Sequence, residues 1–319
     1  MKILNKHIAI IALSSVFFTS CIKDFEEVNT NQLQPTDEQA SRDGMSSGGY
    51  FAELVSLPIP TGTGTGPAND YQVIQNMSTD NWVGYFSPGR NHWDGGNNQT
   101  SYYLSDFRLN GTFSTLVKIM NPYFQMKTQT HNVKTVNGRL VYESKDISSQ
   151  AIYSVAQIVK IMGMHRATDL FGPIPYSDME PGKVKAKYDS QEQVYRSFLR
   201  ELDEAVTTLN QYGASNKVLE EYDPVYGGDT SKWIRLANSL MLRLAMRVRY
   251  ADAALSQEYV GKAIAGGLIE NDDQAGKLVT SSKYIFHHSL VTMLGYGELK
   301  MGATIYSYLK GYNDPRMEK

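Results

Sequence analysis

The sequence predicts a mostly α-helical protein in which packed helices support one long irregular segment. Three stretches of the chain carry apolar residues at spacings of three and four, the pattern of amphipathic helices. No strong alternating pattern typical of strands competes with them. Hydrophobic residues make up 41% of the 319 residues and charged residues 20%, so the chain can bury a sizeable core as one large domain or two small ones.

The N-terminus has the features of a secretory signal. Lys2 and Lys6 form a short basic region, and an apolar stretch follows over residues 8–18. This stretch is too short for a comfortable membrane span. Two small residues then precede Cys21, which resembles the lipobox of bacterial lipoproteins, although Phe18 replaces the usual leucine. We therefore expect residues 1–20 to be a lipoprotein signal peptide and Cys21 to be lipidated.

Lipidation of Cys21 has two consequences. Acyl chains on this residue would anchor the protein stably, because each buried methylene contributes about 0.8 kcal/mol. Cys21 is also the single cysteine, so disulfides, thiolate metal sites and cysteine catalysis are excluded once it is acylated. Residues 21–43 are predicted to form a lipidated flexible tether, with a charged cluster at 23–27 that is either a surface-export signal or simply solvated. The folded domain is expected over residues 44–319.

The helices follow from the apolar stripes and the residues that flank them. The stripe that begins at Tyr195 follows Ser190 and Gln193, a pair that fits a capping box. A second stripe starts at Trp233, and either Asp229 or Thr230 suits its N-cap. The other predicted helical segments are 69–79, 113–132, 152–162, 257–266 and 298–310, and residues 139–142 form a possible short strand.

The irregular segment over residues 58–112 is the candidate binding region. Its glycine- and proline-containing start cannot hold a regular element, and its aromatic content argues against disorder. Sugars have apolar faces and hydroxyl edges, so their binding sites combine flat aromatic rings with amide, carboxylate and guanidinium groups. The side chains predicted to contact a ligand are Asn81, Trp82, Tyr85, Arg90, Trp93, Asp94, Tyr102 and Tyr103.

The residues give little support for nucleic-acid binding, catalysis or metal binding. The net charge of −2 gives no basic surface for nucleic acid. Gly44 to Gly48 match G-x-S-x-G, but no hydrophobic strand precedes them to form a nucleophile elbow. The histidines include no HExxH, and the Asn/Asp/Gly run near Asp94 lacks the carboxylate spacing of an EF-hand. We therefore predict no catalytic residues, no metal site and no cofactor. Four arginines are expected to be solvated or paired with acidic neighbours: Arg235, Arg243, Arg247 and Arg249.

Three later segments, taken in order, resemble the SusD/RagB family. The first is Asp169-Leu170-Phe171-Gly172-Pro173-Ile174-Pro175-Tyr176, and the second is the helix from Gln193 to Ala205. The third runs from Asp223-Pro224-Val225-Tyr226-Gly227-Gly228-Asp229 to Leu244 and includes Trp233, for which we expect a place in the core. With the lipoprotein start and the closing Asn313-Asp314-Pro315-Arg316, the resemblance extends over nearly the whole chain.

The resemblance implies a SusD-like fold of tetratricopeptide-like helix pairs with long irregular loops. It implies an outer-membrane, lipid-anchored and surface-exposed protein that binds oligosaccharides or polysaccharides and delivers them to a SusC-like TonB-dependent transporter, without enzymatic activity. Family members continue well past Arg316, so we expect the chain to be the N-terminal part of the fold, truncated at its C-terminus. Two alternatives stay open: a peptide-binding import lipoprotein of the same fold, and a secreted glycoside hydrolase that uses two converging carboxylates.

Overall fold

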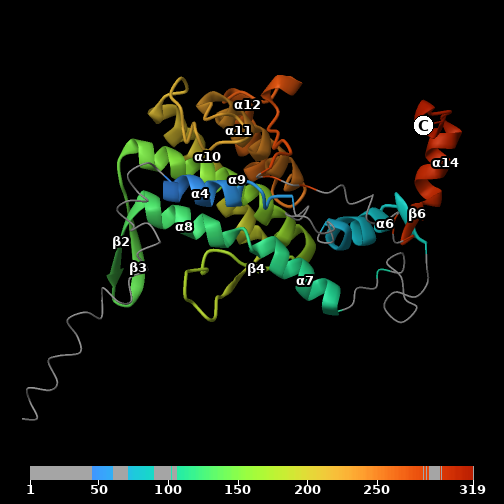
Figure 1. The fold of residues 1–319 in the computed structure, drawn as a ribbon, viewed down its shortest axis with the longest axis horizontal. Coiled ribbons are helices and arrows are strands. Elements are labelled where there is room, and N and C mark those ends of the chain that lie inside the picture. Colours follow the sequence, from blue (N-terminus) through green and yellow to red (C-terminus); the bar gives the residue numbers. More distant parts are fainter. Residues whose placement is uncertain are drawn as a thin grey trace, which may run out of the picture. The chain divides into compact units, whose positions relative to one another are not determined.

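The computed structural model describes residues 45–59, 71–89, 102, 106–282, 284, 286, 295 and 297–318. Helices dominate this part of the chain, as the sequence predicts (Figure 1). The bounds of the helices are α4 (Met45–Leu54), η1 (Gln72–Thr79, a π-helix), α6 (Asp80–Trp82), α7 (Asp106–Val117), α8 (Met120–Thr130), α9 (Ile147–Phe171), α10 (Gln191–Tyr212), α11 (Thr230–Arg247), α12 (Ala253–Ala265), η4 (Asp272–Gln274), α14 (Ala303–Gly311) and η5 (Pro315–Glu318).

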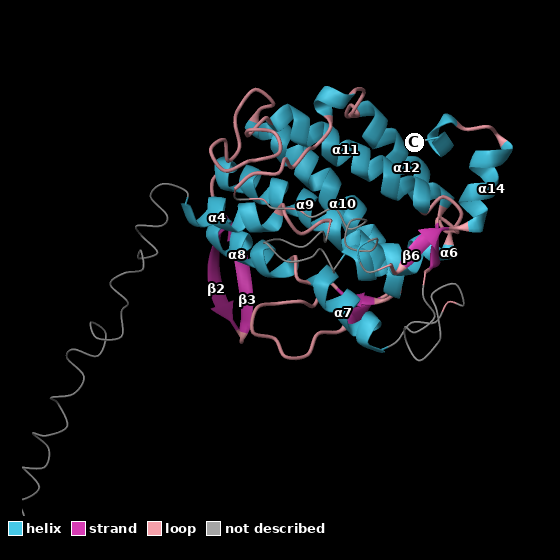
Figure 2. Ribbon diagram, turned by 45° about the vertical axis from the view of Figure 1, so that its right-hand side comes forward, coloured by secondary structure: helices cyan, strands magenta, loops and turns pink. Residues whose placement is uncertain are grey.

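Within the described residues the strands form three antiparallel pairs. The hairpin of β2 and β3 can be followed in Figure 2. Two pairs are local, whereas β1 and β6 are more than two hundred residues apart in the sequence. The pairs are β1 (Phe86–Pro88) with β6 (Leu299–Met301), β2 (His131–Val136) with β3 (Arg139–Ser144), and β4 (Ile174–Pro175) with β5 (Tyr188–Asp189).

Helices α7 to α12 form what we call the helical scaffold. Helix α10 packs against both α9 and α11, and α11 packs in turn against α12, so successive helices lie side by side (Figures 1 and 2). The predicted capping box starts α10: the Ser190 hydroxyl accepts from the backbone N–H of Gln193, whose side chain accepts from the backbone N–H of Ser190. Asp229 caps α11 in the same way by accepting from the backbone N–H of Lys232.

The scaffold core consists of closely packed aromatic and aliphatic side chains. Trp233 is 1% exposed, contacts Phe51 of α4 edge to face with ring centres 6.0 Å apart, and donates from Nε1 to Asp223 Oδ2 over 2.8 Å. This confirms the predicted place of Trp233 in the core. Gly172 ends α9 with φ of 72°, a conformation that favours glycine. Pro173, which cannot continue a helix, then redirects the chain.

A smaller group of elements, here called the aromatic module, consists of η1, α6, β1, β6 and α14, together with Tyr85 and with Tyr102, whose ring stacks on Trp82. Its apolar centre is small: Met77 and Leu299 are buried, and Phe86 packs against them. Backbone bonds join its two halves, since Gly302 donates to Tyr85 O over 2.9 Å and Ile305 to Gly84 O over 3.2 Å.

Two sequence predictions about elements were wrong. The segment 298–310 was expected to be helical, but its first residues form β6, because they find a partner in β1. The helix predicted over 113–132 is two helices interrupted at Lys118 and Ile119, and its last two residues start β2. Strand β2 has one buried residue and five exposed ones, so no apolar alternation marks it.

Candidate functional site

The aromatic module carries the predicted ligand-binding residues that the structure describes. Trp82 ends α6 and is half-buried, and the Tyr102 ring stacks on it with ring centres 5.8 Å apart and planes at 29°. Tyr102 is 71% exposed and Tyr85 is 54% exposed. The structure thus brings Trp82 and Tyr102 together and presents two tyrosine rings to solvent near the start of β1.

Asn81 has a different position from the exposed rings. Its side chain is 4% exposed, and its Nδ2 donates to the carbonyl oxygen of Asn76 over 2.8 Å. This bond ties Asn81, the residue before Trp82, to the backbone of η1. Arg90, Trp93, Asp94 and Tyr103 lie outside the described residues, as does Cys21.

A network of amide side chains holds the segment that carries Trp82. Asp80 accepts from Gln75 Nε2 over 2.8 Å and from Asn76 Nδ2 over 2.7 Å, and the buried Gln72 donates to Glu298. The bond from Gln72 ties the π-helix to the residue before β6. π-Helical geometry is rare, and its short form inside α-helices is frequent at functional sites.

Within the described residues, three buried polar atoms of this segment have no hydrogen-bond partner: Asn76 Oδ1, Asn81 Oδ1 and Trp82 Nε1. Leaving such an atom unpaired costs about 1–3 kcal/mol. Native proteins pair most buried polar atoms, and a specific exception calls for an explanation such as strain, a functional role or a bound water. The unpaired atoms therefore mark the segment that carries Trp82 as a candidate site.

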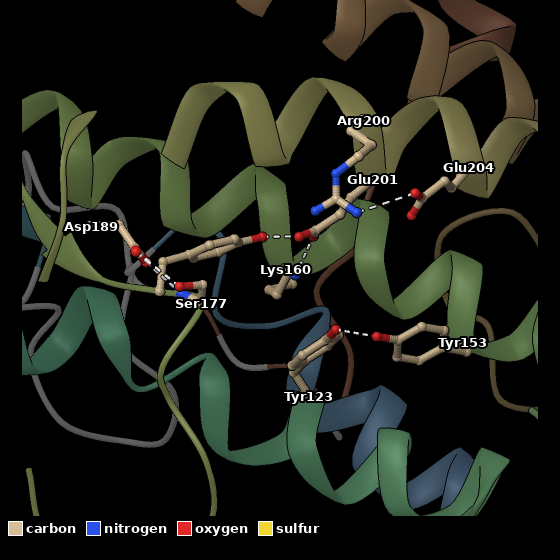
Figure 3. Close-up of polar contacts among 9 residues, drawn as sticks. Tyr123, Tyr153, Lys160, Ser177, Asp189, Arg200, Glu201 and Glu204 are labelled. Carbon is tan, nitrogen blue, oxygen red and sulfur yellow. Dashed lines mark hydrogen bonds and ion pairs between the residues drawn. The ribbon is translucent and has the colours of Figure 1, made fainter. Parts of the chain in front are cut away.

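A second polar cluster lies inside the scaffold, between α8, α9 and α10 (Figure 3). Lys160 Nζ lies 2.6 Å from Glu201 Oε2, and its side chain is 3% exposed. Tyr176 donates to the same carboxylate oxygen over 2.7 Å. Lys160 also lies 4.4 Å from the ring centre of Tyr123, whose hydroxyl contacts that of Tyr153 at 2.6 Å.

This cluster has the character of a structural ion pair. Burial lowers the pKa of Lys160, while Glu201 opposes that shift by favouring the charged ammonium. Burial also raises the pKa of Tyr123 and of Tyr176 well above the ordinary value. With each group paired and enclosed, the cluster fixes α9 against α10 and holds the chain after β4.

The arginines of α11 are partly paired, as expected from the sequence. Arg247 contacts Asp169 at 2.5 Å, and Arg235 lies 3.8 Å from Glu270. The partner of Arg247 on α9 was not predictable from the sequence, because Asp169 lies more than seventy residues away.

Within the described ranges no helix is long and apolar enough to cross a bilayer, and these ranges hold no group of three or more His, Cys, Asp or Glu side chains suited to a metal ion.

Comparison with solved structures gives the same fold. The protein BT1043 is 36% identical, with a TM-score of 0.73 over 85% of this chain and 52% of its own. A chitin-binding SusD homologue from Flavobacterium johnsoniae is 30% identical, with a TM-score of 0.71 over 85% of this chain and 53% of its own. A SusD homologue from Bacteroides vulgatus is 28% identical, with a TM-score of 0.71 over 86% and 53%. The chain spans about half the length of these structures.

Comparison with curated protein sequences gave no match. The family model described as "Susd and RagB outer membrane lipoprotein" matches residues 27–319, which is most of the chain. These relatives have the tetratricopeptide-like helical architecture that the sequence resemblance implied. The chain therefore belongs to the SusD-like family of outer membrane lipoproteins.

Proposed function

We propose that this protein binds glycans at the cell surface through the rings of the aromatic module. The observation that carries the proposal is the Trp82–Tyr102 stack, which is partly open to solvent and belongs to a segment whose buried amide and indole atoms have no partner among the described residues. Flat rings pack against the apolar face of a pyranose, and nearby polar atoms bond its hydroxyl groups. The similarity to a chitin-binding homologue supports a glycan as the ligand.

The bound glycan then passes to a SusC-like TonB-dependent transporter, and the protein acts by binding and not by catalysis. Family membership supports this role. Cys21 would hold the protein at the outer membrane through its acyl chains. Labelling of cells with a palmitate analogue tests the anchor: the wild-type chain should incorporate label, and a Cys21→Ser variant should not.

Calorimetric titration of the purified full-length chain with chitin oligosaccharides and a panel of neutral polysaccharides tests the binding proposal. We expect saturable binding without product release. Trp82→Ala should weaken it at least tenfold, about 1.4 kcal/mol or more. Tyr188→Ala is the matched control, because Tyr188 is an exposed ring, at 64%, that lies on β5 outside the aromatic module.

Two results would contradict the proposal. Binding of a peptide pool with no glycan binding would favour the peptide-import alternative. Release of shortened sugars during the titration would favour the hydrolase.

A further inference from the structure

An ionic cavity of about 410 Å³ lies where α9 and α11 end and where α10 and α12 begin. On one wall Asp169 accepts from the Tyr195 hydroxyl over 2.6 Å and from Arg247 over 2.5 Å. On the other wall Arg196 donates to Glu192 over 2.9 Å and to Asp252 over 2.6 Å. The cavity therefore has guanidinium groups on both walls, and each is held in place by a carboxylate.

Positive charge exceeds negative charge on the α9–α11 side. We call Arg166, Arg243 and Arg247 the arginine cluster. Arg243 lies one helical turn before Arg247 and is exposed, and no ion pair is formed by it within the described residues. Arg166 donates to Gln75 over 3.0 Å. Burial lowers the pKa of Arg166, and the charge of Arg243 lowers it further. These like charges are close enough to repel, and Asp169 is the carboxylate paired with the cluster.

The last turn of α9 reaches both the ionic cavity and the region of Trp82. Asp169 lines the ionic cavity, while the next two residues of α9, Leu170 and Phe171, line a small cavity of about 40 Å³ together with Trp82. Arg166 also contacts η1 directly through Gln75. The last turn of α9 is therefore shared between the ionic cavity and the aromatic module.

We propose that the arginine cluster and the ionic cavity bind the carboxylate or sulfate groups of an acidic glycan whose neighbouring sugar lies on the aromatic module. This inference rests on the glycan-binding function proposed above and specifies its substrate class. Each guanidinium has five N–H donors in a planar fork that matches a carboxylate or a sulfate. Within the described residues, Asp169 accepts from one nitrogen of Arg247 and Arg243 forms no ion pair, so both guanidinium groups have donors left for an anion.

The neighbouring acids set the selectivity of such a site. Asp169, Glu192 and Asp252 surround the cavity and would repel an anion that approaches from their side. An acidic group is favoured only where it reaches Arg243 and Arg247. A glycan that is already oriented by ring stacking on Trp82 meets this requirement, whereas a free anion gains no such orientation.

The test compares two oligosaccharides of equal length on the purified full-length chain: a hyaluronan hexasaccharide, which carries carboxylates, and a neutral chitin hexasaccharide. We expect the acidic ligand to bind at least tenfold more tightly at low salt, with an advantage that decreases as salt screens the charges. The double variant Arg243→Gln, Arg247→Gln should abolish the advantage and leave chitin binding unchanged. Arg200→Gln, an exposed arginine paired with Glu204 on α10, serves as the charge-matched control.

The outcomes distinguish a failure of the acidic-glycan inference from a failure of the proposed glycan binding. Equal binding of both sugars, or an acidic preference that survives in the double variant, would overturn the acidic-glycan inference and leave glycan binding intact. Absence of binding by either sugar would overturn both. If a glutamate-rich peptide bound with the same dependence on Arg243 and Arg247, the site would belong to a protein partner and the inference would be wrong.

Discussion

The helical scaffold and the aromatic module bury their side chains in different ways. The scaffold encloses whole layers, with Trp233, Phe198 and Leu202 at 1% exposure or less, and it pairs even its buried charge, Lys160. Among the described residues, the centre of the module consists of Met77 and Leu299, and the buried Asn76 Oδ1, Asn81 Oδ1 and Trp82 Nε1 have no partner. Under the glycan-binding proposal, stability belongs to the scaffold and recognition to the module.

Breaking the buried ion pair of Lys160 and Glu201 should cause the largest loss of unfolding free energy, which would show that the scaffold carries the stability of the fold. Lys160→Met leaves Glu201 as an uncompensated buried carboxylate, which typically costs about 3–5 kcal/mol of unfolding free energy. Urea denaturation followed by far-UV circular dichroism measures the loss. The double variant Lys160→Met, Glu201→Leu should recover much of it, because no lone charge is left behind. Arg200→Met should change stability by less than about 1 kcal/mol, since its pair with Glu204 is exposed.

If Lys160→Met lowers the free energy of unfolding by less than about 1 kcal/mol, water reaches the pair of Lys160 and Glu201. The scaffold would then not enclose this ion pair.

Matched truncations in the two cores measure how much each core contributes to global stability. Leu202→Ala should lower the global free energy of unfolding by about 2–5 kcal/mol, because Leu202 is fully buried. Leu299→Ala should barely move the global transition, since it acts on the small core of the module. It should instead speed hydrogen exchange of the amides of Gly302 and Ile305. These amides donate to the backbone oxygens of Tyr85 and Gly84, just before β1.

If Leu202→Ala and Leu299→Ala shifted the global unfolding transition equally, the division between the scaffold and the module would be wrong. The module and the scaffold would then unfold as one cooperative unit.

The smallest expected effect is a pH dependence confined to the scaffold. Burial raises the pKa of Tyr226 to about 12, with Asp223 and Asp229 adding to the shift. The unfolded chain has an ordinary tyrosine pKa near 10. The native state therefore favours the protonated phenol, and this stabilisation is complete below pH 10 and is lost as the pH rises through 12. Tyr226→Phe should flatten that part of the stability profile, measured by urea denaturation between pH 9 and 12.

Tyr188→Phe is the control, because Tyr188 is exposed. An unchanged slope in Tyr226→Phe would show that other groups carry the alkaline transition.

The scaffold was largely predictable from sequence, because its signals are local. The stripe after Tyr195 and the Ser190–Gln193 pair lie within one helix, and both are confirmed. The pairing of β1 with β6 was not predictable, since each strand has only three residues and its partner is distant in the chain. The arginine cluster was not predictable for the same reason: Arg247 reaches Asp169 only after α9 and α11 have packed. Among the candidate site residues, Trp82, Tyr85 and Tyr102 were named from composition, but the stack between Trp82 and Tyr102 required the structure.

The long separation between β1 and β6 also sets an order of events in time. Contacts between distant parts of a chain form slowly, because a large loop must close before they contribute any stability. Helices α9 to α11 have near neighbours in sequence and can assemble early, while residues 86–88 must wait for residues 299–301. A chain whose scaffold has already assembled therefore still lacks the β1–β6 pair, and the aromatic module is the part of the described fold that matures last.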